Sequence, residues 1–296
     1  MARKSLTSVD AATRLVALIG DPVEHSLSPL IHNAAFQAQQ LNFIYVALRV
    51  NLVDIAAAIA GLRTLGFLGA NVTAPHKQTV IPELDRLTEQ ASRIGAVNTI
   101  VARDVGGRVE LEGDNTDVPG FLAPLDEHRA RLEGASMTIL GSGGAARAVA
   151  YALLTTYNPH SLTLAVRTPA RGESLASDLL RFDGTSALRV VPIRESRDAV
   201  RRSRLLVNTT PLGTHPDVHQ TPWKDYDAIG AGHIVYDLVY NPHYTRLLKD
   251  AAGRGATTIG GLDMLIAQAA AAYVRWTGTK MPTRIVREAL RERTNP

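Results

Sequence analysis

In the first part of the chain, strand-like apolar segments alternate with segments in which the apolar positions have a helical spacing. Three segments rich in β-branched and aliphatic residues predict strands: RLVALIG (14–20), FIYVALRV (43–50) and LGANVTA (68–74). The segments between them, SPLIHNAAFQAQQ (28–40) and NLVDIAAAIAGLRTL (51–65), have the spacing of amphipathic helices. Ser28 before Pro29 predicts that the first helix starts there, with Ser28 as its cap.

Residues 96–117, AVNTIVARDVGGRVELEGDNTD, predict a hairpin that turns at Gly106 and Gly107. A helical segment, VPGFLAPLDEHRARL (118–132), then leads to a second pattern. That pattern opens with a strand, a glycine turn and a helix in SMTILGSGGAARAVAYALL (136–154). Short strand-like segments follow: SLTLAVRT (161–168), LRVVPI (188–193), RLLVNTT (204–210), HIVYDLVY (233–240) and ATTIGG (256–261).

Strands that alternate with helices predict right-handed βαβ units and a parallel sheet covered on both faces, so the fold class is α/β. The length of 296 residues fits two domains, and 45% hydrophobic residues supply ample core. No apolar run is long enough to span a membrane. Residues 1–13 are interpreted as a short leader to the first strand, not as a signal peptide.

Cysteine is absent, which excludes disulfides and thiolate metal sites and makes the cytoplasm the expected location. The net charge of +4 fits anionic small molecules. We interpret the basic run RDAVRRSR (197–204) as a solvated helix face, so no nucleic-acid partner is expected. His215 and His219 flank Pro216 without a completing carboxylate, so no metal site is predicted.

The sequence ILGSGGAARA places Gly141, Gly143 and Ala146 in the G-x-G-x-x-A spacing of a dinucleotide-binding turn. NAD enzymes commonly have an acidic residue at the end of the next strand, whereas this strand ends in LAVRTPAR. Arg167 and Arg171, with Thr168 between them, suit a 2′-phosphate, and we therefore predict NADP. The alternatives are a glycine turn without a ligand and two solvated arginines.

Lys77 raises a question, because GANVTAPHKQ (69–78) predicts a helix that begins at Pro75 and has this lysine in its first turn. The macrodipole disfavours a cation there. A lysine destabilised in this way can exchange a proton near neutral pH, as hydride transfer to a carbonyl requires. The motif GDNTD (113–117) offers a carboxylate partner. The alternative is that Lys77 is only a salt-bridge residue.

Eight motifs occur in a fixed order and together resemble the shikimate/quinate dehydrogenase family. They are HSLSP (25–29), NVTAPHK (71–77), GAVNTI (95–100), GDNTD (113–117), GSGGAAR (141–147), NTTPLG (208–213), YDLVYNP (236–242) and GLDMLIAQAA (261–270). The resemblance implies NADP-dependent, reversible reduction of 3-dehydroshikimate to shikimate in chorismate biosynthesis. It also implies a substrate domain (1–118), a Rossmann-type doubly wound cofactor domain (119–258) and C-terminal helices (259–296) that return to the first domain.

The resemblance assigns roles by position, with the active site in the cleft between the domains. Lys77 and Asp117 would be the acid/base pair. The substrate would be bound by Ser26, Ser28, Thr73, Asn98, Tyr240 and Gln268. The cofactor would be bound by Gly141, Gly143, Gly144, Ala145, Ala146, Arg167, Thr168, Arg171, Asn208, Thr209, Leu238 and Gly261. The expected state is a monomer or homodimer.

Several alternatives stay open. Ser28 and Asp117 could be helix caps, Tyr240 could be core, and Gln268 on its own would be interpreted as a surface residue. Val166, Asp263 and Gln78 depart from the family pattern. The main alternative function is a dual quinate/shikimate dehydrogenase that uses NAD or NADP. More remote are a dinucleotide-sensing regulatory protein without catalysis and a Rossmann reductase for another substrate.

Overall fold

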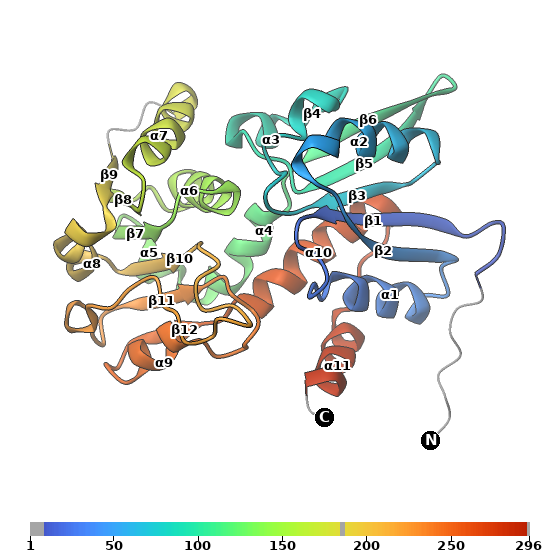
Figure 1. Cartoon of the computed structure of the whole chain (residues 1–296). Helices are drawn as coiled ribbons and strands as arrows, with labels where there is room; N and C mark the ends of the chain where they lie inside the picture. Colours follow the sequence, from blue (N-terminus) through green and yellow to red (C-terminus); the bar gives the residue numbers. More distant parts are fainter. Residues whose placement is uncertain (1–8, 184–186, 295–296) are drawn as a thin grey trace. The chain divides into compact units, whose positions relative to one another are not determined.

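The computed structural model describes residues 9–183 and 187–294, and residues 1–8 of the expected leader lie outside these ranges. The chain divides into two compact units (Figure 1). Unit 1 combines Met1–Thr116 with Ala269–Pro296, and unit 2 is Asp117–Gln268. Within the described ranges, no helix is both long enough and apolar enough to cross a membrane.

Unit 1 is built on a six-stranded mixed sheet in the order β2-β1-β3-β5-β6-β4. Its strands are β1 (Arg14–Gly20), β2 (Phe43–Arg49), β3 (Gly69–Val72), β4 (Arg86–Leu87), β5 (Thr99–Val105) and β6 (Arg108–Asp114). The strand β1 is parallel to β2 and β3, whereas β5 is antiparallel to β3 and β6. Gly106 and Gly107, both with positive φ, form the two-residue turn of the predicted β5–β6 hairpin.

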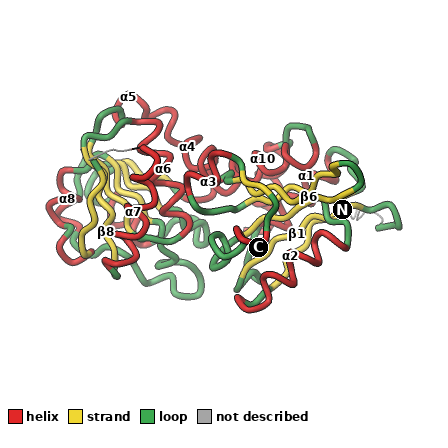
Figure 2. Tube along the Cα trace, turned by 90° about the horizontal axis from the view of Figure 1, so that it is seen from above, coloured by secondary structure: helices red, strands yellow, loops and turns green. Residues whose placement is uncertain are grey.

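Helices cover both faces of this sheet (Figures 1 and 2). They are α1 (Ser28–Ala38), α2 (Ile55–Thr64), α3 (Glu89–Ile94), the second half of α10 (Gly261–Thr277) and α11 (Thr283–Thr294), with 3₁₀ turns η1 (Leu52–Asp54) and η2 (Ile81–Glu83). Ile55, Ile59 and Leu62 of α2 pack into an aliphatic core with β1, β3 and β5. On the other face, aromatic side chains of α1, β2 and α10 pack together.

Two local predictions in unit 1 were wrong. The capping position of α1 is Leu27, and Ser28 is the first helical residue. No α-helix begins at Pro75, because residues 74–80 form turns that lead into η2. Tertiary contacts of His76 and Lys77, described below, hold this segment as turns and override the local preference for a helix.

Unit 2 is a doubly wound parallel sheet in the order β12-β11-β10-β7-β8-β9, which confirms the predicted fold class. Its strands are β7 (Ser136–Leu140), β8 (Ser161–Val166), β9 (Leu188–Pro192), β10 (Leu205–Asn208), β11 (Ile234–Asp237) and β12 (Thr257–Ile259). Its helical elements are α4 (Asp117–Leu122), η3 (Ala123–His128), α5 (Arg129–Leu132), α6 (Gly144–Tyr157), α7 (Pro169–Asp183), η4 (Ile193–Glu195), α8 (Arg197–Arg202), η5 (Tyr226–Ala228) and α9 (Arg246–Ala252).

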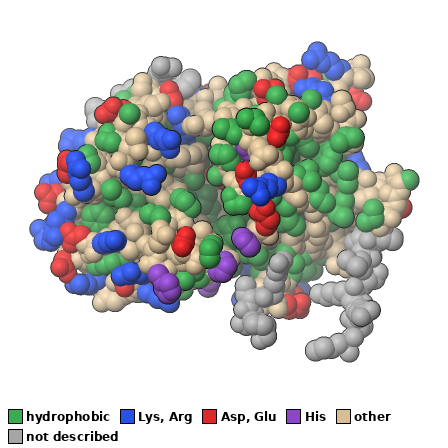
Figure 3. Space-filling view, in the orientation of Figure 1, with side chains coloured by type: hydrophobic (Ala, Val, Ile, Leu, Met, Phe, Trp, Pro, Cys, Tyr) green, Lys and Arg blue, Asp and Glu red, His purple; other side chains and the backbone are tan. Residues whose placement is uncertain are grey.

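The helices α8 and α9 pack on one face of this sheet through Val200, Leu247 and Leu248, and Figure 1 shows α6 and α7 over the other face. The predicted basic run lies in and just after α8. On the face of the molecule drawn in Figure 3, Lys and Arg side chains are interspersed with Asp and Glu. This arrangement differs from the continuous basic stripe of nucleic-acid binding proteins.

Candidate functional site

The strand register of unit 1 brings most of the predicted substrate residues to one edge of its sheet. Parallel β1 and β3 end at this edge, and antiparallel β5 begins there, opposite the end of β6. Four segments therefore meet: residues 21–28 after β1, residues 73–77 after β3, Asn98 before β5 and residues 115–116 after β6. Ligands of open α/β sheets bind at such edges.

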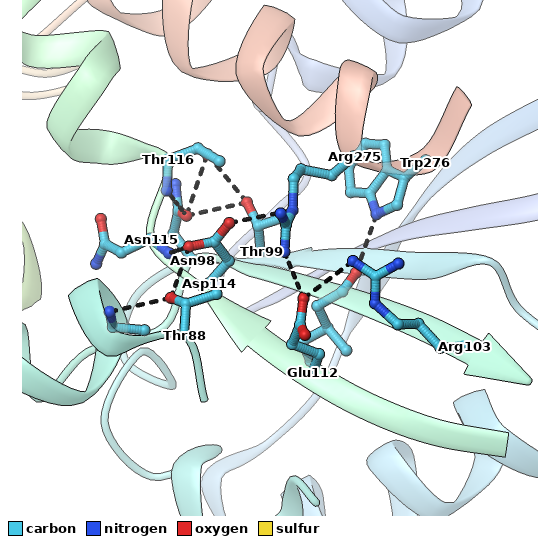
Figure 4. A network of polar contacts seen from close by, with 12 residues as sticks. Thr88, Asn98, Thr99, Arg103, Glu112, Asp114, Asn115, Thr116, Arg275 and Trp276 are labelled. Atoms are coloured by element: carbon cyan, nitrogen blue, oxygen red, sulfur yellow. Dashed lines mark hydrogen bonds and ion pairs between the residues drawn. The ribbon is translucent and has the colours of Figure 1, made fainter. Parts of the chain in front are cut away.

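Asn98 is the centre of a buried polar network at this edge (Figure 4). Its side-chain oxygen accepts hydrogen bonds from the Thr116 amide at 2.7 Å, from the Thr116 hydroxyl at 3.1 Å and from the Thr99 hydroxyl at 3.0 Å. The carbonyl oxygen of Asn98 accepts from the side-chain amide of Asn71 at 3.1 Å. Asn98 is thus held rigidly, and so is Thr116, the residue before Asp117.

A second branch of the network reaches Ser28. The side-chain oxygen of Asn71 accepts from the Tyr45 hydroxyl at 2.8 Å. The same hydroxyl has a hydrogen bond with the Ser28 side chain, although burial dominates and raises the pKa of Tyr45 well above its usual value. Ser28 is buried and does not cap its helix, so the capping alternative was wrong. Instead, the Ser26 hydroxyl accepts from the Ser28 amide at 3.2 Å.

Lys77 is half-buried in the turn that follows β3. Its carbonyl oxygen accepts from the Val97 amide at 2.7 Å, one residue before Asn98. Thr73 is also half-buried, and its amide donates to the Ile19 carbonyl at the end of β1. The Lys77 turn is therefore bonded to the segment that leads through Asn98 into β5, and Thr73 before it is bonded to the end of β1.

An ion-pair cluster continues the network along β6 (Figure 4). Arg275 of α10 pairs with Glu112, and its Nε lies 3.2 Å from an oxygen of Asp114. The other Asp114 oxygen accepts from the Thr88 hydroxyl and from the Asn115 amide, each at 2.8 Å. This cluster fixes the GDNTD motif from the side of the C-terminal segment, three residues before Asp117.

In unit 2 the predicted phosphate-binding turn follows β7, and its local geometry fits a dinucleotide. Gly141 has φ of +118°, and a Cβ added there would lie 2.5 Å from the Thr209 hydroxyl. A Cβ at Gly143 would meet nothing within 4 Å, so packing does not explain this glycine. Dinucleotide-binding turns have glycine at this position because the backbone then lies close to the pyrophosphate. The helix α6 begins at the next residue and directs its amides to this place.

The cationic side chains predicted to bind the 2′-phosphate lie where they were expected. Arg167 and Thr168 follow β8, and Arg171 is in the first turn of α7; all three are exposed. Neither guanidinium forms an ion pair with any residue whose position the structure describes. Val166, where the family pattern often has Asn, is buried at the end of β8 and packs toward Gly172.

The ends of β10 and β11 are joined by a buried network that sequence reasoning missed. The Asn208 amide donates to Asp237 at 2.8 Å, and the Thr245 hydroxyl donates to the other Asp237 oxygen at 2.6 Å. Burial raises the pKa of Asp237, and the hydrogen bonds from Thr245, Val239 and Asn208 oppose that shift. The Asn208 oxygen accepts from the amide and hydroxyl of Thr210. These bonds shape the loops after both strands.

The remaining predicted residues of unit 2 are placed as follows. Gly261 packs against Leu238, because a Cβ on Gly261 would lie 2.2 Å from the Leu238 carbonyl. Tyr240 is half-buried. Gln268 is buried, so the interpretation as a surface residue was wrong, and its amide donates to the Leu265 carbonyl. Asp117 is buried and is the first residue of α4.

Sequence reasoning missed five polar residues that are buried beside predicted site residues. They are Tyr45, Asn71, His76, Thr116 and Asp237. Asn71 and Asp237 interrupt apolar strand segments, GANV and HIVYDLVY, and that interruption was the available signal. A buried polar group within an apolar run needs a partner, and here the partners belong to the site.

The fold and the glycine turn define unit 2 as a Rossmann-type dinucleotide-binding domain. Comparison with known families is more specific. Residues 18–100 match the shikimate dehydrogenase substrate binding domain, and residues 261–291 match the shikimate 5′-dehydrogenase C-terminal domain. The chain is 57% identical over 285 residues to the NADP⁺ shikimate dehydrogenase of Salinibacter ruber, covering 96% of this chain and 99% of that protein.

Comparison with solved structures indicates the same family. A shikimate dehydrogenase crystallised with NADP⁺ superposes with a TM-score of 0.88 at 35% identity, covering 98% of both chains. The quinate dehydrogenase of Corynebacterium glutamicum, in complex with NAD, has a TM-score of 0.84 at 33% identity and covers 95% of this chain and 99% of that one. The chain belongs to the shikimate dehydrogenase family.

Proposed function

We propose that this protein is an NADP-dependent shikimate dehydrogenase that reversibly reduces 3-dehydroshikimate to shikimate in chorismate biosynthesis. The observation that carries the proposal is the polar edge of unit 1, where Asn98, Ser28 and the Lys77 turn are bonded into one frame. A ring with several hydroxyls and a carboxylate needs many fixed polar partners, because unpaired site groups are costly. We place the reaction in the cytoplasm.

In this proposal Lys77 of unit 1 and Asp117, the first residue of unit 2, exchange the proton, and residues of both units bind the substrate. Lys77 donates its ammonium proton to the carbonyl oxygen that becomes the hydroxyl, and takes a proton back in the reverse direction. Asp117 is the carboxylate that shares in this proton exchange. The helix that was expected to destabilise the Lys77 ammonium is absent. In this proposal the role of Lys77 therefore depends on how the turn positions the Lys77 backbone. Ser26, Ser28, Thr73 and Asn98 bind substrate, with Tyr240 and Gln268 of unit 2.

Unit 2 holds the cofactor, which supplies or accepts the hydride when bound. The turn from Gly141 to Ala146 receives the pyrophosphate. Arg167, Thr168 and Arg171 bind the 2′-phosphate, and Thr209 lies beside the turn. The Asn208 amide is occupied by Asp237 and Thr210, so we assign it the task of holding this loop. Leu238 and Gly261 line the nicotinamide side.

A four-way assay tests the proposal, with shikimate and quinate each offered with NADP⁺ and NAD⁺. Formation of reduced cofactor is followed by absorbance at several concentrations of each component. We expect the largest kcat/KM for shikimate with NADP⁺, by about tenfold or more over quinate, because discrimination of one hydroxyl by a hydrogen-bonding site is large. Equal turnover of quinate would support the dual quinate/shikimate alternative, and no turnover of either would favour the non-catalytic one.

A further inference from the structure

His76, which precedes Lys77, is buried in a way that no assigned role explains. Its side chain has 0% exposure, and its ring Nε2 lies 2.6 Å from the carbonyl oxygen of Val50, at the end of the β2 segment. A carbonyl can only accept, so Nε2 is the protonated ring nitrogen and donates this hydrogen bond. The bond connects the Lys77 turn to a part of the chain 26 residues earlier.

The Lys77 turn is held from two sides. On one side the His76 ring is bonded to Val50. On the other side the Lys77 carbonyl accepts from the Val97 amide at 2.7 Å. Between these anchors, the amide of Val80 donates to the His76 carbonyl at 3.0 Å and closes the turn. The backbone of Lys77 therefore lies between a side-chain anchor and the segment with Val97 and Asn98 that leads into β5.

A packing role alone does not account for a histidine at this place. The other ring nitrogen, Nδ1, is buried and forms no hydrogen bond with any residue in the described ranges. Burying an unpaired polar atom costs free energy, of about 1–3 kcal/mol. An apolar side chain of similar size would fill the same space without that cost. What a histidine adds here is the Nε2 donor and its fixed direction.

We propose that His76 is a positioning residue that holds Lys77 in place for proton transfer. The inference rests on the proposed role of Lys77. The ring does not touch the reacting atoms in this proposal; it acts through the backbone of the next residue. Small displacements of a proton donor are costly, since an error of about 1 Å can reduce a rate a hundredfold.

Three variants test this. His76→Phe keeps an aromatic ring and removes the donor, whereas His76→Gln keeps an amide N–H near the position of Nε2. Lys77→Ala is the reference. We expect kcat to fall at least about tenfold in His76→Phe and to remain within about threefold of wild type in His76→Gln. The KM for NADP⁺ should be unchanged in both, because the cofactor residues belong to unit 2.

Other outcomes overturn the inference in distinguishable ways. Wild-type kcat in His76→Phe, with only a lower melting temperature, would make the histidine purely structural. Equal losses in His76→Phe and His76→Gln would show that the donor is not what matters. If Lys77→Ala remains active, the proposed role of Lys77 fails first. If His76→Phe does not fold, hydrogen exchange of the Val97 amide is measured in His76→Gln and His76→Met instead. Protection of this amide that is retained only in His76→Gln supports the proposal. Equal protection in both variants contradicts it.

Discussion

A guanidinium in the first turn of a helix is electrostatically unfavourable, and Arg171 occupies this place in α7. Arg167, four residues earlier, follows β8 and is equally exposed. Neither side chain has an acidic partner among the described residues. A phosphate dianion would satisfy both guanidiniums and the amides at the start of the helix. Their place after β8 and at the start of α7 was predictable from sequence, because it is defined relative to the glycine turn. Their binding of the 2′-phosphate stays a prediction.

Removing both guanidiniums in Arg167→Ala/Arg171→Ala should raise the KM for NADP⁺ about a hundredfold. Hydrogen bonds to charged groups are each worth about 1.5–3 kcal/mol, and 1.4 kcal/mol is a factor of ten. The KM for NAD⁺, which lacks the 2′-phosphate, should change by less than about threefold. Arg254→Ala is the control, since Arg254 is exposed, pairs with Asp227 and precedes β12 rather than following β8. Parallel increases for both cofactors would exclude a phosphate-binding role.

Single residues buried within apolar segments were harder to interpret. Asn71 and Asp237 are visible in the sequence, but the Tyr45 and Asn98 partners of Asn71 and the Asn208 partner of Asp237 are 26 to 29 residues away. Ser28 shows the same limit, because Ser before Pro is a common helix start and local pattern favoured a cap. Its burial against Tyr45 is a tertiary property that no local pattern reports.

At the level of elements, Tyr45 connects α1, β2 and β3 in one hydrogen-bonded group. Tyr45→Phe removes only the hydroxyl and leaves the buried Asn71 oxygen without this donor. We expect the free energy of unfolding to fall by about 1–3 kcal/mol. The KM for shikimate should rise about fivefold, because Ser28 and Asn98 are no longer connected through the Tyr45 hydroxyl and Asn71. The KM for NADP⁺ should stay constant. Steady-state kinetics and urea unfolding measure both effects.

The aromatic cluster supplies a matched control in Tyr273→Phe. The Tyr273 hydroxyl also donates one hydrogen bond, to Gln39 at 2.7 Å, and neither residue belongs to the four segments that meet at the polar edge of unit 1. The stability loss should be similar in size, with no change in the KM for shikimate. If both variants raise this KM alike, the Tyr45 network does not position the substrate residues.

Elements with a strong hydrophobic periodicity were predicted well, whereas the segment after β3, which has no such periodicity, was not. The hairpin β5–β6 and the strands of both sheets other than β4 follow from alternation, apolar runs and turn residues, whereas the two-residue β4 was not predicted. The segment after β3 was predicted as a helix because Pro75 suits a first helical residue. The buried ring of His76 and the Val97–Lys77 bond determine its turns instead, and both contacts are distant in sequence.

At the scale of the folded molecule, His32 makes stability depend on pH. It is fully buried, stacks on Tyr45 with ring centroids 4.4 Å apart, and neither ring nitrogen bonds to a described residue. Burial lowers the pKa of His32 from 6.5 to about 3. Between these values the unfolded chain binds a proton that the folded protein does not, so stability falls as pH falls from 6.5 toward 3. The loss approaches about 4 kcal/mol at the acid end.

Urea unfolding at several pH values between 7 and 4 measures this. Fluorescence of Trp276 in a Trp223→Phe background reports unit 1, which contains His32. The variant His32→Phe should lose stability on acidification less steeply than the parent, by about 1.4 kcal/mol per pH unit below 6. His160→Asn, at an exposed position, should keep the parental slope. Identical slopes in all three proteins would contradict the prediction.

The division of unit 1 into two stretches of chain has a consequence for biosynthesis. All of unit 2, Asp117–Gln268, is translated between the two parts of unit 1. Domains generally fold as units while the ribosome is still at work. Unit 2 can therefore complete its sheet first, whereas the edge that carries Lys77 and Asn98 must wait for Trp276 to bond to Ile100 and for Arg275 to reach Glu112. Unit 1, which carries the proposed proton donor Lys77, is therefore finished last.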